Sequence, residues 1–532
     1  MILFIGAAFS ESRLKSSPDD EVTHLTAGMS YLISHQIFRD NPQHPPLLKE
    51  LSALSLWAGK VHWPRTPEAD YLVRGDDPET VYRLPNPVGV QVLAANGPER
   101  VRRWARPPMI LIGALLVAVI FLWTRALFGG IAAVFATLVC ALDPIVLGHS
   151  QFVTTDVGVA AFTALALFLL WQYLSLPRWR TLIFTGLAFG AALSAKFSAI
   201  FLVPIAAVLL IAAVKWPVSE AAKTARLRVR ERSAAIAFLV ICAVAFVFVQ
   251  ATYFFPQDLS IYWKCALTVD ADHLPTDLHF LFGELRPSFP HYFLVAYLVK
   301  EPIASILLAL IGLVFVVRSR SVPVLARVFL LLPPAVFFVA VSAMAANIGV
   351  RYLTPVLVFC HMLAGVGFAA LVSRRSRLSV GLAAALGVWL IFAAIGIYPD
   401  QLSYYNEAAC LLTEPRYLGR DGGSRCGVYW LDDSNGDWGQ GYVELKNWMD
   451  RNAPGRIANA TYTSFIPPDL LGLRLKRTLP AELLQPPKEG LYVVSAYWVS
   501  RLMAQSQTNW IQFTRPTAIV GHALYVYDLQ KP

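Results

Sequence analysis

The sequence predicts an α-helical protein that crosses a membrane about ten or eleven times. Three observations lead to this class. Of the 532 residues, 56% are hydrophobic and only 15% are charged, whereas soluble proteins carry about 25% charged residues. The mean hydropathy is +0.52, and long uncharged stretches recur along the chain. This composition excludes a water-soluble enzyme, a disordered scaffold and a disulfide-stapled secreted domain.

Ten stretches reach or approach the length of about 20 apolar residues that a helix needs to cross the hydrocarbon core. They cover residues 109–127, 130–147, 157–175, 181–195, 197–214, 234–255, 293–317, 328–346, 352–372 and 379–398. The stretch 181–195 is short, but Arg180 and Lys196 on either side could extend toward the interfaces. Residues 1–9 are apolar and span only about 14 Å as a helix. We expect either a start further upstream or the remnant of an eleventh span. A signal peptide does not fit, because no basic segment precedes the apolar run.

Lys and Arg are distributed unequally between the two sets of loops. The richer set holds Arg125, Arg178, Arg180, Lys215, Lys223, Arg226, Arg228, Arg230, Arg232, Arg318, Arg320, Arg327, Arg374, Arg375 and Arg377. The other set holds Lys196, Lys264, Arg286 and Arg351. Short cytoplasmic loops are enriched in Lys and Arg, so the richer set is predicted to be cytoplasmic. The net charge of +10 then reflects topology and implies no nucleic-acid partner.

These spans divide the chain into four predicted segments. They are a partial first span (1–9), a long outer loop rich in Pro and polar residues (10–105), the membrane bundle (106–398) and an outer C-terminal domain (399–532). In the last segment, residues 442–451 have the pattern of an amphipathic helix, while 490–497 and 518–529 alternate like strands. We therefore expect a small α/β domain. Cys410 and Cys426 both lie in it, and the sequence leaves open whether they form a bridge.

Ionisable residues gather where the predicted spans end on the outer side: Asp143, His149, Asp156, Lys196 and Arg351. Such a group costs about 2.5–3.5 kcal/mol at the centre of a membrane helix, and transporters accept that cost along the path of their substrate. Here the span centres are almost free of Asp, Glu, Lys and Arg. The pattern favours chemistry on a membrane-dissolved substrate at the outer interface. The alternatives are a transporter or flippase for a lipid-linked sugar, and an assembly protein, for which ten spans exceed what an anchor needs.

Six short motifs surround these positions, each of which alone could be a helix end whose charge extends to the interface. They are Asp19-Asp20-Glu21-Val22-Thr23-His24, His44-Pro45-Pro46-Leu47-Leu48-Lys49, Thr154-Thr155-Asp156, Ala195-Lys196, Gly349-Val350-Arg351-Tyr352-Leu353-Thr354-Pro355 and Asp433-Ser434-Asn435-Gly436-Asp437-Trp438-Gly439-Gln440. A helix that begins near Asp19 or Asp20 would place Asp20 and His24 one turn apart on one face. Alternatively, Asp19 or Asp20 is only a helix cap, with Glu21 in the first turn. The prolines after His44 fix an extended backbone, which would hold His44 near the surface.

In their order and spacing, these motifs resemble the bacterial branch of the GT-C glycosyltransferases over about residues 18–450. That branch is related to protein O-mannosyltransferases and to the aminoarabinose transferases of lipid A. The resemblance implies the GT-C fold and a polyprenyl-phosphate-linked sugar as donor. It also implies inverting transfer to a hydroxyl of a protein, lipid or glycan acceptor at the periplasmic face of the inner membrane. The catalytic base implied by the resemblance is an acidic residue of the first outer loop, at the position of Asp20.

The remaining roles follow from this chemistry. Asp20, Glu21 and Asp156 are the candidate catalytic residues, and Asp156 would hold a donor sugar hydroxyl or orient a cation. Lys196 and Arg351 are expected to bind the leaving phosphate, for which Arg offers a two-point fork. His44 is a further candidate for that phosphate, although aminoarabinose transferases carry Lys at this place. The expected supporting residues are His24, Asp433, Asn435 and Asp437.

A divalent cation is the one cofactor that the sequence suggests. Four residues fall at positions 1, 3, 5 and 12 of an EF-hand-like loop: Asp433, Asn435, Asp437 and Glu444. Trp438 occupies the place where that loop needs Gly, so the alternative is an Asp- and Asn-rich turn that caps the helix after Gly439. A second group could also bind an ion: Asp20, Glu21, His24 and His44.

Overall fold

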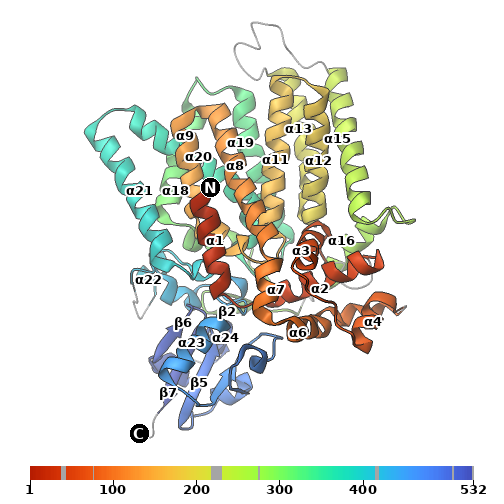
Figure 1. Cartoon of the computed structure of the whole chain (residues 1–532). Helices are drawn as coiled ribbons and strands as arrows, with labels where there is room; N and C mark the ends of the chain where they lie inside the picture. Colours follow the sequence, from red (N-terminus) through yellow and green to blue (C-terminus); the bar gives the residue numbers. More distant parts are fainter. Residues whose placement is uncertain are drawn as a thin grey trace.

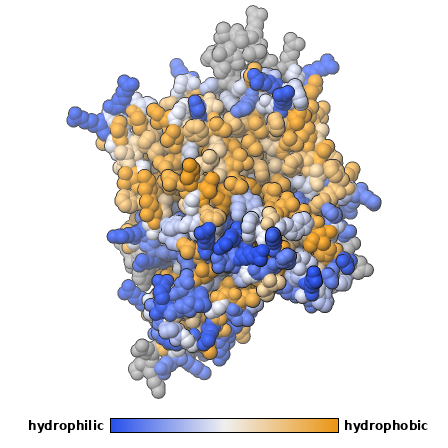
Figure 2. Space-filling model, viewed as in Figure 1, coloured by the Kyte–Doolittle hydropathy of each residue, from blue (hydrophilic) through white to orange (hydrophobic). Residues whose placement is uncertain are grey.

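Figure 1 shows the computed structural model of the chain, in which a bundle of long helices stands on a layer of short helices and a small sheet. The structure describes residues 1–37, 43–75, 77–216, 231–272, 276–413, 418–505 and 509–529. Four of the basic residues used to predict the orientation lie outside these ranges: Lys223, Arg226, Arg228 and Arg230. On the face shown in Figure 2, an apolar belt covers the bundle between two hydrophilic ends. This is the surface that a membrane-spanning protein requires.

Long apolar helices form the bundle, as predicted. Seven helices in the described ranges are long and apolar enough to cross a membrane, or up to nine if two bent pairs each count as one span. The long helices are α8 (Pro107–Phe128), α9 (Gly130–Leu142), α11 (Asp156–Ser175), α12 (Trp179–Ala195), α13 (Leu202–Lys215), α15 (Glu231–Thr252), α18 (Ile303–Arg318), α19 (Val324–Met344), α20 (Thr354–Ser373) and α21 (Arg377–Ile397). The short helices α10 (Pro144–Ser150) and α17 (Tyr292–Lys300) adjoin α9 and α18. The predicted short span 181–195 corresponds to α12, and α1 (Ile2–Leu14) packs against α8.

Two of the predicted spans are not continuous helices, and in this respect the prediction was wrong. The span predicted over 130–147 bends by 58° between α9 and α10, at Asp143-Pro144. The span predicted over 293–317 bends by 112° between α17 and α18, at Glu301-Pro302. Proline explains both breaks, because it has no N–H to donate and its ring clashes with the preceding turn. Both breaks leave a carboxylate inside the bundle.

The segment predicted as a Pro-rich outer loop is largely helical. Its helices are α2 (Asp19–Ser34), α3 (Leu47–Ala58), α4 (Pro67–Arg74), α5 (Pro78–Arg83), α6 (Pro85–Asn96) and α7 (Pro98–Ala105). Helices α4 to α8 each begin at a proline, because a helix start needs no N–H there and the fixed φ suits the first turn. Thus these prolines mark helix starts. A second connection, between α15 and α17, holds α16 (Ile261–Asp272) and a hairpin of β1 (His279–Leu281) and β2 (Glu284–Arg286).

A mixed five-stranded sheet organises the C-terminal segment, with the strand order β4-β3-β5-β7-β6. Its strands are β3 (Ala458–Thr461), β4 (Leu475–Arg477), β5 (Gly490–Ser495), β6 (Ala518–Val520) and β7 (Leu524–Leu529). The helices of the segment are α22 (Ala408–Leu411), α23 (Tyr442–Asn452), α24 (Ala496–Gln505) and α25 (Trp510–Phe513). Strand β3 is parallel to β4 and β5, and β7 is antiparallel to β5 and β6. Along β5, Leu491 and Val493 pack with α23, while Tyr492 and Val494 pack with α24 and α25, as strand alternation requires.

The patterns in this segment predicted its elements with two differences. The helix predicted over 442–451 is α23. The strand predicted over 490–497 ends at Ser495, where α24 begins directly. The single strand predicted over 518–529 was wrong, because β6 and β7 form a hairpin. Its turn at Gly521-His522 has φ values of 60° and 53°, which reverse the chain without interrupting the alternation.

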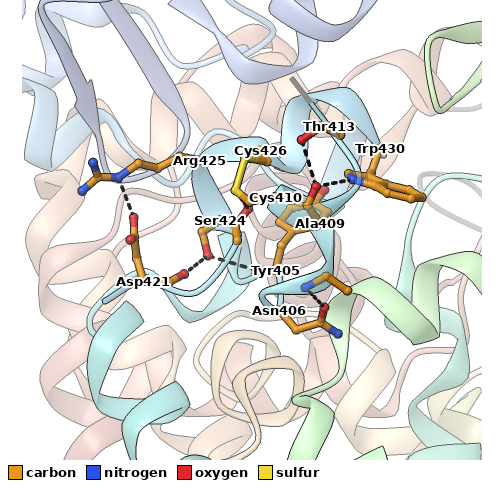
Figure 3. Close-up of a disulfide and its surroundings, with 12 residues drawn as sticks. Tyr405, Asn406, Ala409, Cys410, Thr413, Asp421, Ser424, Arg425, Cys426 and Trp430 are labelled. Carbon is orange, nitrogen blue, oxygen red and sulfur yellow. Dashed lines mark hydrogen bonds and ion pairs between the residues drawn. A yellow bond between two sulfur atoms is a disulfide. The ribbon is translucent and has the colours of Figure 1, made fainter. Parts of the chain in front are cut away.

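Cys410 and Cys426 form a disulfide (Figure 3), which settles the alternative that the sequence left open. The bond joins α22 to the turn after Gly423. Next to it, the indole N–H of Trp430 donates a hydrogen bond to the carbonyl of Ala409 at 2.9 Å. Both cysteines pack in the same hydrophobic cluster as the bundle helices, so the disulfide joins two segments that lie against the bundle.

A buried ionic network ties the sheet to the start of the chain. His522, in the β6–β7 turn, contacts Asp400 through Nδ1 at 2.6 Å and Asp421 through Nε2 at 2.8 Å. Asp400 also pairs with Lys15, just after α1. Burial by itself would lower the pKa of His522, but hydrogen bonds to the two carboxylates raise it to about 9. Both ring nitrogens face carboxylates, so the ring is held as an imidazolium.

This network predicts a loss of stability at alkaline pH. The pKa of His522 is raised in the fold from its ordinary value of 6.5 to about 9. Its contribution to the free energy of unfolding is therefore complete below pH 6.5 and is lost as the pH rises through about 9. Thermal unfolding of the detergent-solubilised protein from about pH 6 to pH 10 would measure this loss. We expect His522→Gln to flatten that dependence, whereas substitution of the exposed His291 by Gln should leave it unchanged. Equal pH slopes in the wild type and His522→Gln would contradict this account.

Candidate active site

Two ion pairs lie next to each other where α2 meets the bundle. Asp20 Oδ2 is 2.9 Å from Arg351 Nη1, and Asp156 Oδ1 is 2.6 Å from Lys196 Nζ. The ring of Tyr352 adjoins both cations, with its centre 4.1 Å from Lys196 Nζ and 5.7 Å from Arg351 Cζ. The structure thus brings together four predicted site residues that are far apart in the sequence. We call these four residues and Tyr352 the ionic cluster.

Each charged member of the ionic cluster is at the end of a helix. Asp20 is in the first turn of α2, Asp156 is the first residue of α11, and Lys196 follows α12. Arg351 lies in the 3₁₀ turn Val350–Leu353 that leads into α20. Charged side chains at helix ends can leave the apolar bundle, which explains why these spans tolerate them. A hydrogen bond of 2.8 Å from Thr354 Oγ1 to the carbonyl of Asp156 joins α11 to α20 beneath the cluster.

Helix α2 begins where the acidic motif predicted a helix start. It begins at Asp19, so Asp20 and His24 are one turn apart. Neither aspartate caps the helix, because Pro18 is at the N-cap and no side-chain cap hydrogen bond is made. Asp19 Oδ1 instead accepts a hydrogen bond of 2.9 Å from the Phe465 amide, and burial raises its pKa to about 7. The Asp20 side chain is 38% exposed, and both aspartates are only partly buried.

A polar cavity of about 410 Å³ opens beside Asp20. It is lined by Asp19, Asp20, Thr23, His24, Gln43, His44, Tyr82, Arg83, Pro85, Asn86 and Phe465. The His24 and His44 rings meet edge to face, with centres 5.4 Å apart. Burial lowers the pKa of His24 to about 3 and that of His44 well below its usual value. Both rings are therefore neutral at pH 7, so His44 could donate a hydrogen bond to a phosphate but brings no positive charge to it.

Arg351 is held from two sides and keeps one donor without a protein partner. Its guanidinium carbon lies 4.1 Å from the ring centre of Trp438, a cation–π contact. The His149 ring also meets Trp438, with ring centres 5.8 Å apart. Among the residues that the structure describes, buried Arg351 Nε has no hydrogen-bond partner. An unpaired buried donor on a cation is a place where an anion can bind.

The Asp- and Asn-rich motif supports Arg351 through the backbone. Asn435 Oδ1 accepts a hydrogen bond of 3.0 Å from the Val350 amide, and Ser434 Oγ donates one of 2.8 Å to the carbonyl of Ile348. Asp433 has a φ of 55°, a left-handed conformation that turns the chain toward the loop of Ile348 and Val350. Burial raises the pKa of Asp433, although nearby Arg351 acts to lower it. Asn435 and Ser434 thus hold the backbone beside Arg351, while the supporting roles expected for Asp433 and Asn435 stay predictions.

The predicted calcium loop does not form around this motif. Asp437 Oδ1 accepts a hydrogen bond of 2.9 Å from the Gly439 amide, and Glu444 pairs with Lys15 at 2.6 Å. Together with the contact from Asn435 to Val350, these bonds direct three of the four side chains to different partners. The turn does not cap α23 either, because Gly441 occupies its N-cap without a side-chain bond. Within the described ranges, Asp20, Glu21, His24 and His44 also form no group of three ligand atoms within 4.8 Å of one another.

Glu21 is a buried structural partner, not a residue of the cavity. Arg106 binds it at two points, from Nε to Oε1 at 2.8 Å and from Nη2 to Oε2 at 2.7 Å. The Val153 amide donates a further hydrogen bond to Oε1 at 3.1 Å. Glu21 is completely buried and is not among the residues that line the polar cavity. These contacts position α2 against the bundle, and the catalytic role expected for Glu21 stays a prediction.

Removal of the Glu21 charge should destabilise the fold. In Glu21→Gln the buried Arg106 loses its counter-charge, which costs about 3–5 kcal/mol in comparable buried pairs. Glu99→Gln is a matched control, because Glu99 pairs with Arg103 at the surface, where such pairs contribute about 0–1 kcal/mol. Thermal unfolding of both variants in detergent would measure the difference. Equal stability of the two variants would show that the Glu21 pair does not hold α2 in place.

The aromatic residues of the site had no predicted role. Tyr352 and Trp438 occur in motifs that the sequence displays, but their contacts with Lys196 and Arg351 are made across the fold. The one signal in the sequence is the adjacency of Tyr352 to Arg351. Nothing in the spacing of Trp438 indicates that it stacks on a residue 87 positions earlier.

Of the comparisons with known proteins, one family match agrees with the resemblance drawn from the motifs. Residues 100–227 match the protein family described as dolichyl-phosphate-mannose-protein mannosyltransferase. No match was found among curated proteins. The chain is similar to the crystal structure of ArnT from Cupriavidus metallidurans bound to undecaprenyl phosphate, with 14% identity, a TM-score of 0.47 and coverage of 99% of this chain and 97% of that one. It is also similar to the oligosaccharyltransferase of Archaeoglobus fulgidus in the apo form, with 13% identity, a TM-score of 0.47 and coverage of 85% and 58%.

The family match confirms the resemblance over the matched segment. That segment contains α8 to α12, and with them Asp156 and Lys196 of the ionic cluster. Together with the apolar helices, it indicates a multi-pass membrane protein that is similar, over residues 100–227, to a mannosyltransferase family.

Proposed function

We propose that this protein is an inverting glycosyltransferase. It would move a sugar from a polyprenyl-phosphate donor to a hydroxyl of a protein, lipid or glycan acceptor at the outer face of the inner membrane. The observation that carries the proposal is the contact between Asp20 and Arg351 beside the polar cavity. A base and a phosphate-binding cation must be neighbours in such a reaction, because the acceptor oxygen and the leaving phosphate flank one anomeric carbon.

The reaction assigns a role to each charged residue of the ionic cluster. Asp20 accepts the proton of the acceptor hydroxyl while the hydroxyl oxygen attacks the anomeric carbon. The bond from that carbon to the phosphate oxygen breaks, and its electron pair leaves with the polyprenyl phosphate. Arg351 and Lys196 stabilise the charge of this leaving group, and Asp156 orients Lys196 or a hydroxyl of the donor sugar.

Burial makes the two cations suitable for this task. The side chains of Arg351 and Lys196 are 10% and 8% exposed, so a phosphate would meet them in a water-poor site where electrostatic attraction is strong. Arg351 Nε, which has no partner in the described part of the chain, could donate to a phosphate oxygen without giving up the pair with Asp20. The family description of a dolichyl-phosphate-mannose donor supports the same class of lipid-linked substrate.

Two features support an outer location for the cluster. Helices α8, α13 and α20 each begin near it and end close to basic residues that were predicted to be cytoplasmic: Arg125, Lys215 and Arg374. By the positive-inside rule, this arrangement supports a position of the cluster on the opposite side of the membrane. The Cys410–Cys426 disulfide lies in the C-terminal segment on the same side, and such bonds persist in oxidising compartments.

Mass spectrometry of envelope glycans and proteins, in cells with and without the gene, would test the proposal. We expect one sugar modification to disappear without the gene and to return with the wild-type gene, while the lipid-linked donor accumulates in its absence. Unchanged envelope glycans and lipid-linked sugars would overturn the proposal.

A detergent assay separates this function from that of a flippase. Donor lipid extracted from the gene-deletion cells would be mixed with purified protein and with envelope acceptor material. A transferase releases polyprenyl phosphate under these conditions, whereas a flippase gives no product because detergent solution has no two leaflets. Absence of release from a monodisperse wild-type protein would favour the flippase.

A further inference from the structure

Three ionisable side chains meet inside the bundle, apart from the ionic cluster. They are Asp143, Glu301 and His361, and all three are completely buried. One ligand atom from each lies within 4.8 Å of the others. Asp143 and Glu301 stand at the two helix breaks, between α9 and α10 and between α17 and α18, while His361 is in α20. We call this group the buried triad.

The triad is only partly satisfied by the protein. His361 Nε2 is 2.7 Å from Asp143 Oδ2 and 3.8 Å from Glu301 Oε1. Asp143 Oδ1 accepts a hydrogen bond from the Val146 amide, and Glu301 Oε1 accepts one from Ser305 Oγ. Within the described ranges, two buried atoms of the triad, Glu301 Oε2 and His361 Nδ1, have no hydrogen-bond partner. A buried carboxylate oxygen without a hydrogen-bond donor is costly in an apolar bundle, and it indicates either a proton shared between Asp143 and Glu301 or a bound cation.

The charges of the triad also require a partner. Among the residues that the structure describes, the ion pairs of Asp143 and Glu301 are made with His361, and neither carboxylate pairs with Lys or Arg. The nearest cation in sequence, Lys300, donates instead to the carbonyls of Leu402 and Asn435. Two carboxylates buried beside one imidazole become neutral in two ways. Either protons bind Glu301 and His361, or a divalent cation binds between two carboxylates and a neutral imidazole.

We propose that Asp143, Glu301 and His361 bind one divalent transition-metal ion, of the class of Zn²⁺ or Mn²⁺. The donor set of one imidazole nitrogen and two carboxylate oxygens suits such an ion. It suits Ca²⁺ and Mg²⁺ less well, because these prefer six or more oxygen ligands. The ion would use Glu301 Oε2, the orphaned oxygen, and would replace the hydrogen bond between His361 and Asp143. This inference does not depend on the proposed glycosyl transfer.

The position of the triad gives such an ion a structural role. Bound there, it would tie both helix breaks to the straight helix α20. The break at Glu301 is already linked to the active site, because Asn406 Nδ2 donates to the Glu301 carbonyl at 2.7 Å and Lys300 donates to the carbonyl of Asn435. Asn435 in turn holds the amide of Val350, next to Arg351. The ion would act on the site through this scaffold and would not touch the substrate.

Metal analysis of the purified chain tests the proposal. The protein, without a polyhistidine tag, would be dialysed in detergent against metal-free buffer and measured by inductively coupled plasma mass spectrometry. We expect about one transition-metal ion per wild-type chain, or the same stoichiometry after addition of ZnCl₂, MnCl₂ or CoCl₂ and gel filtration. In His361→Gln and Glu301→Gln the metal content should fall at least tenfold. His24→Gln and His291→Gln, which alter histidines outside the triad, should retain it.

Two results would overturn the proposal. One is a wild-type protein that holds less than about a tenth of an ion per chain and takes up none of the three added metals, which would leave the shared-proton arrangement. The other is metal that stays in His361→Gln but is lost from His24→Gln, which would place the ion at the polar cavity. If the triad variants do not yield folded protein, the wild-type protein still tests whether a metal ion is bound. Chelation by 1,10-phenanthroline should lower its melting temperature reversibly if an ion is bound, and should have no effect on a proton-bridged triad.

Discussion

Asp20→Asn is expected to reduce glycosyl transfer by about 10²–10⁴-fold, the usual contribution of a general base, while the protein remains folded. Asparagine keeps the size of the side chain but cannot accept the proton of the acceptor hydroxyl. The measurement is the rate of polyprenyl-phosphate release from donor lipid that is extracted from gene-deletion cells, with thermal unfolding as the check on folding. Asp70→Asn, an exposed aspartate of α4, is the matched control and should keep the full rate.

Two further variants distinguish whether Asp20 acts as the general base or only as the ion-pair partner of Arg351. Asp20→Glu retains a carboxylate on a longer side chain and should recover part of the rate, whereas Asp20→Ser should not. Loss of the ion pair by itself would instead raise the donor concentration needed for half-maximal rate. Near-normal turnover in Asp20→Asn would show that another group accepts the proton.

The second large effect is expected at Arg351. Arg351→Lys keeps the positive charge but loses the planar fork, the stacking on Trp438 and the Nε donor. We expect a fall of about 10²–10³-fold in turnover, comparable to the removal of one donor that stabilises developing negative charge. Arg286→Lys is the matched control, because it makes the same substitution at an exposed position of β2. The same release assay measures both variants.

The Arg351 result also tests where the phosphate binds. If Arg351 holds the leaving group, Arg351→Lys should weaken retention of polyprenyl phosphate added as a product inhibitor. Trp438→Phe should cause a smaller loss, because it keeps an aromatic face against the guanidinium. Full activity of Arg351→Lys with unchanged product inhibition would show that the Asp20 pair is only structural.

Much of the architecture could be predicted because a membrane imposes simple rules. Long uncharged stretches predicted the helices, and the proportion of apolar residues left no soluble alternative. Breaks within such stretches were missed, since hydropathy averages over Pro302 and over the neighbouring charge of Glu301. The prolines of the first outer loop were read as loop residues, although each of them can equally begin a helix.

For the site, sequence order and chemistry predicted which charged residues lie at helix ends but not which of them pair. Asp20 and Glu21 are adjacent in the motif, yet one faces the polar cavity and the other is buried against Arg106. A rotation of 100° per residue along α2 separates them, and only the packing of that helix decides which side is exposed. The neutral state of His44 likewise follows from burial beside His24 and not from its motif.

By itself, the sequence determined that this chain folds as a membrane bundle with most of its charged residues outside the apolar stretches, because the hydropathy of each segment is a local property that decides whether it can enter the lipid. It also placed Asp20, Asp156, Lys196 and Arg351 at helix ends. The tertiary structure alone decided that these four share one cluster, that Trp438 stacks on Arg351, and that Asp143, Glu301 and His361 meet inside the bundle. The reason is physical: pairing between charges depends on distances between helices, and those distances are set by how side chains pack across the whole fold.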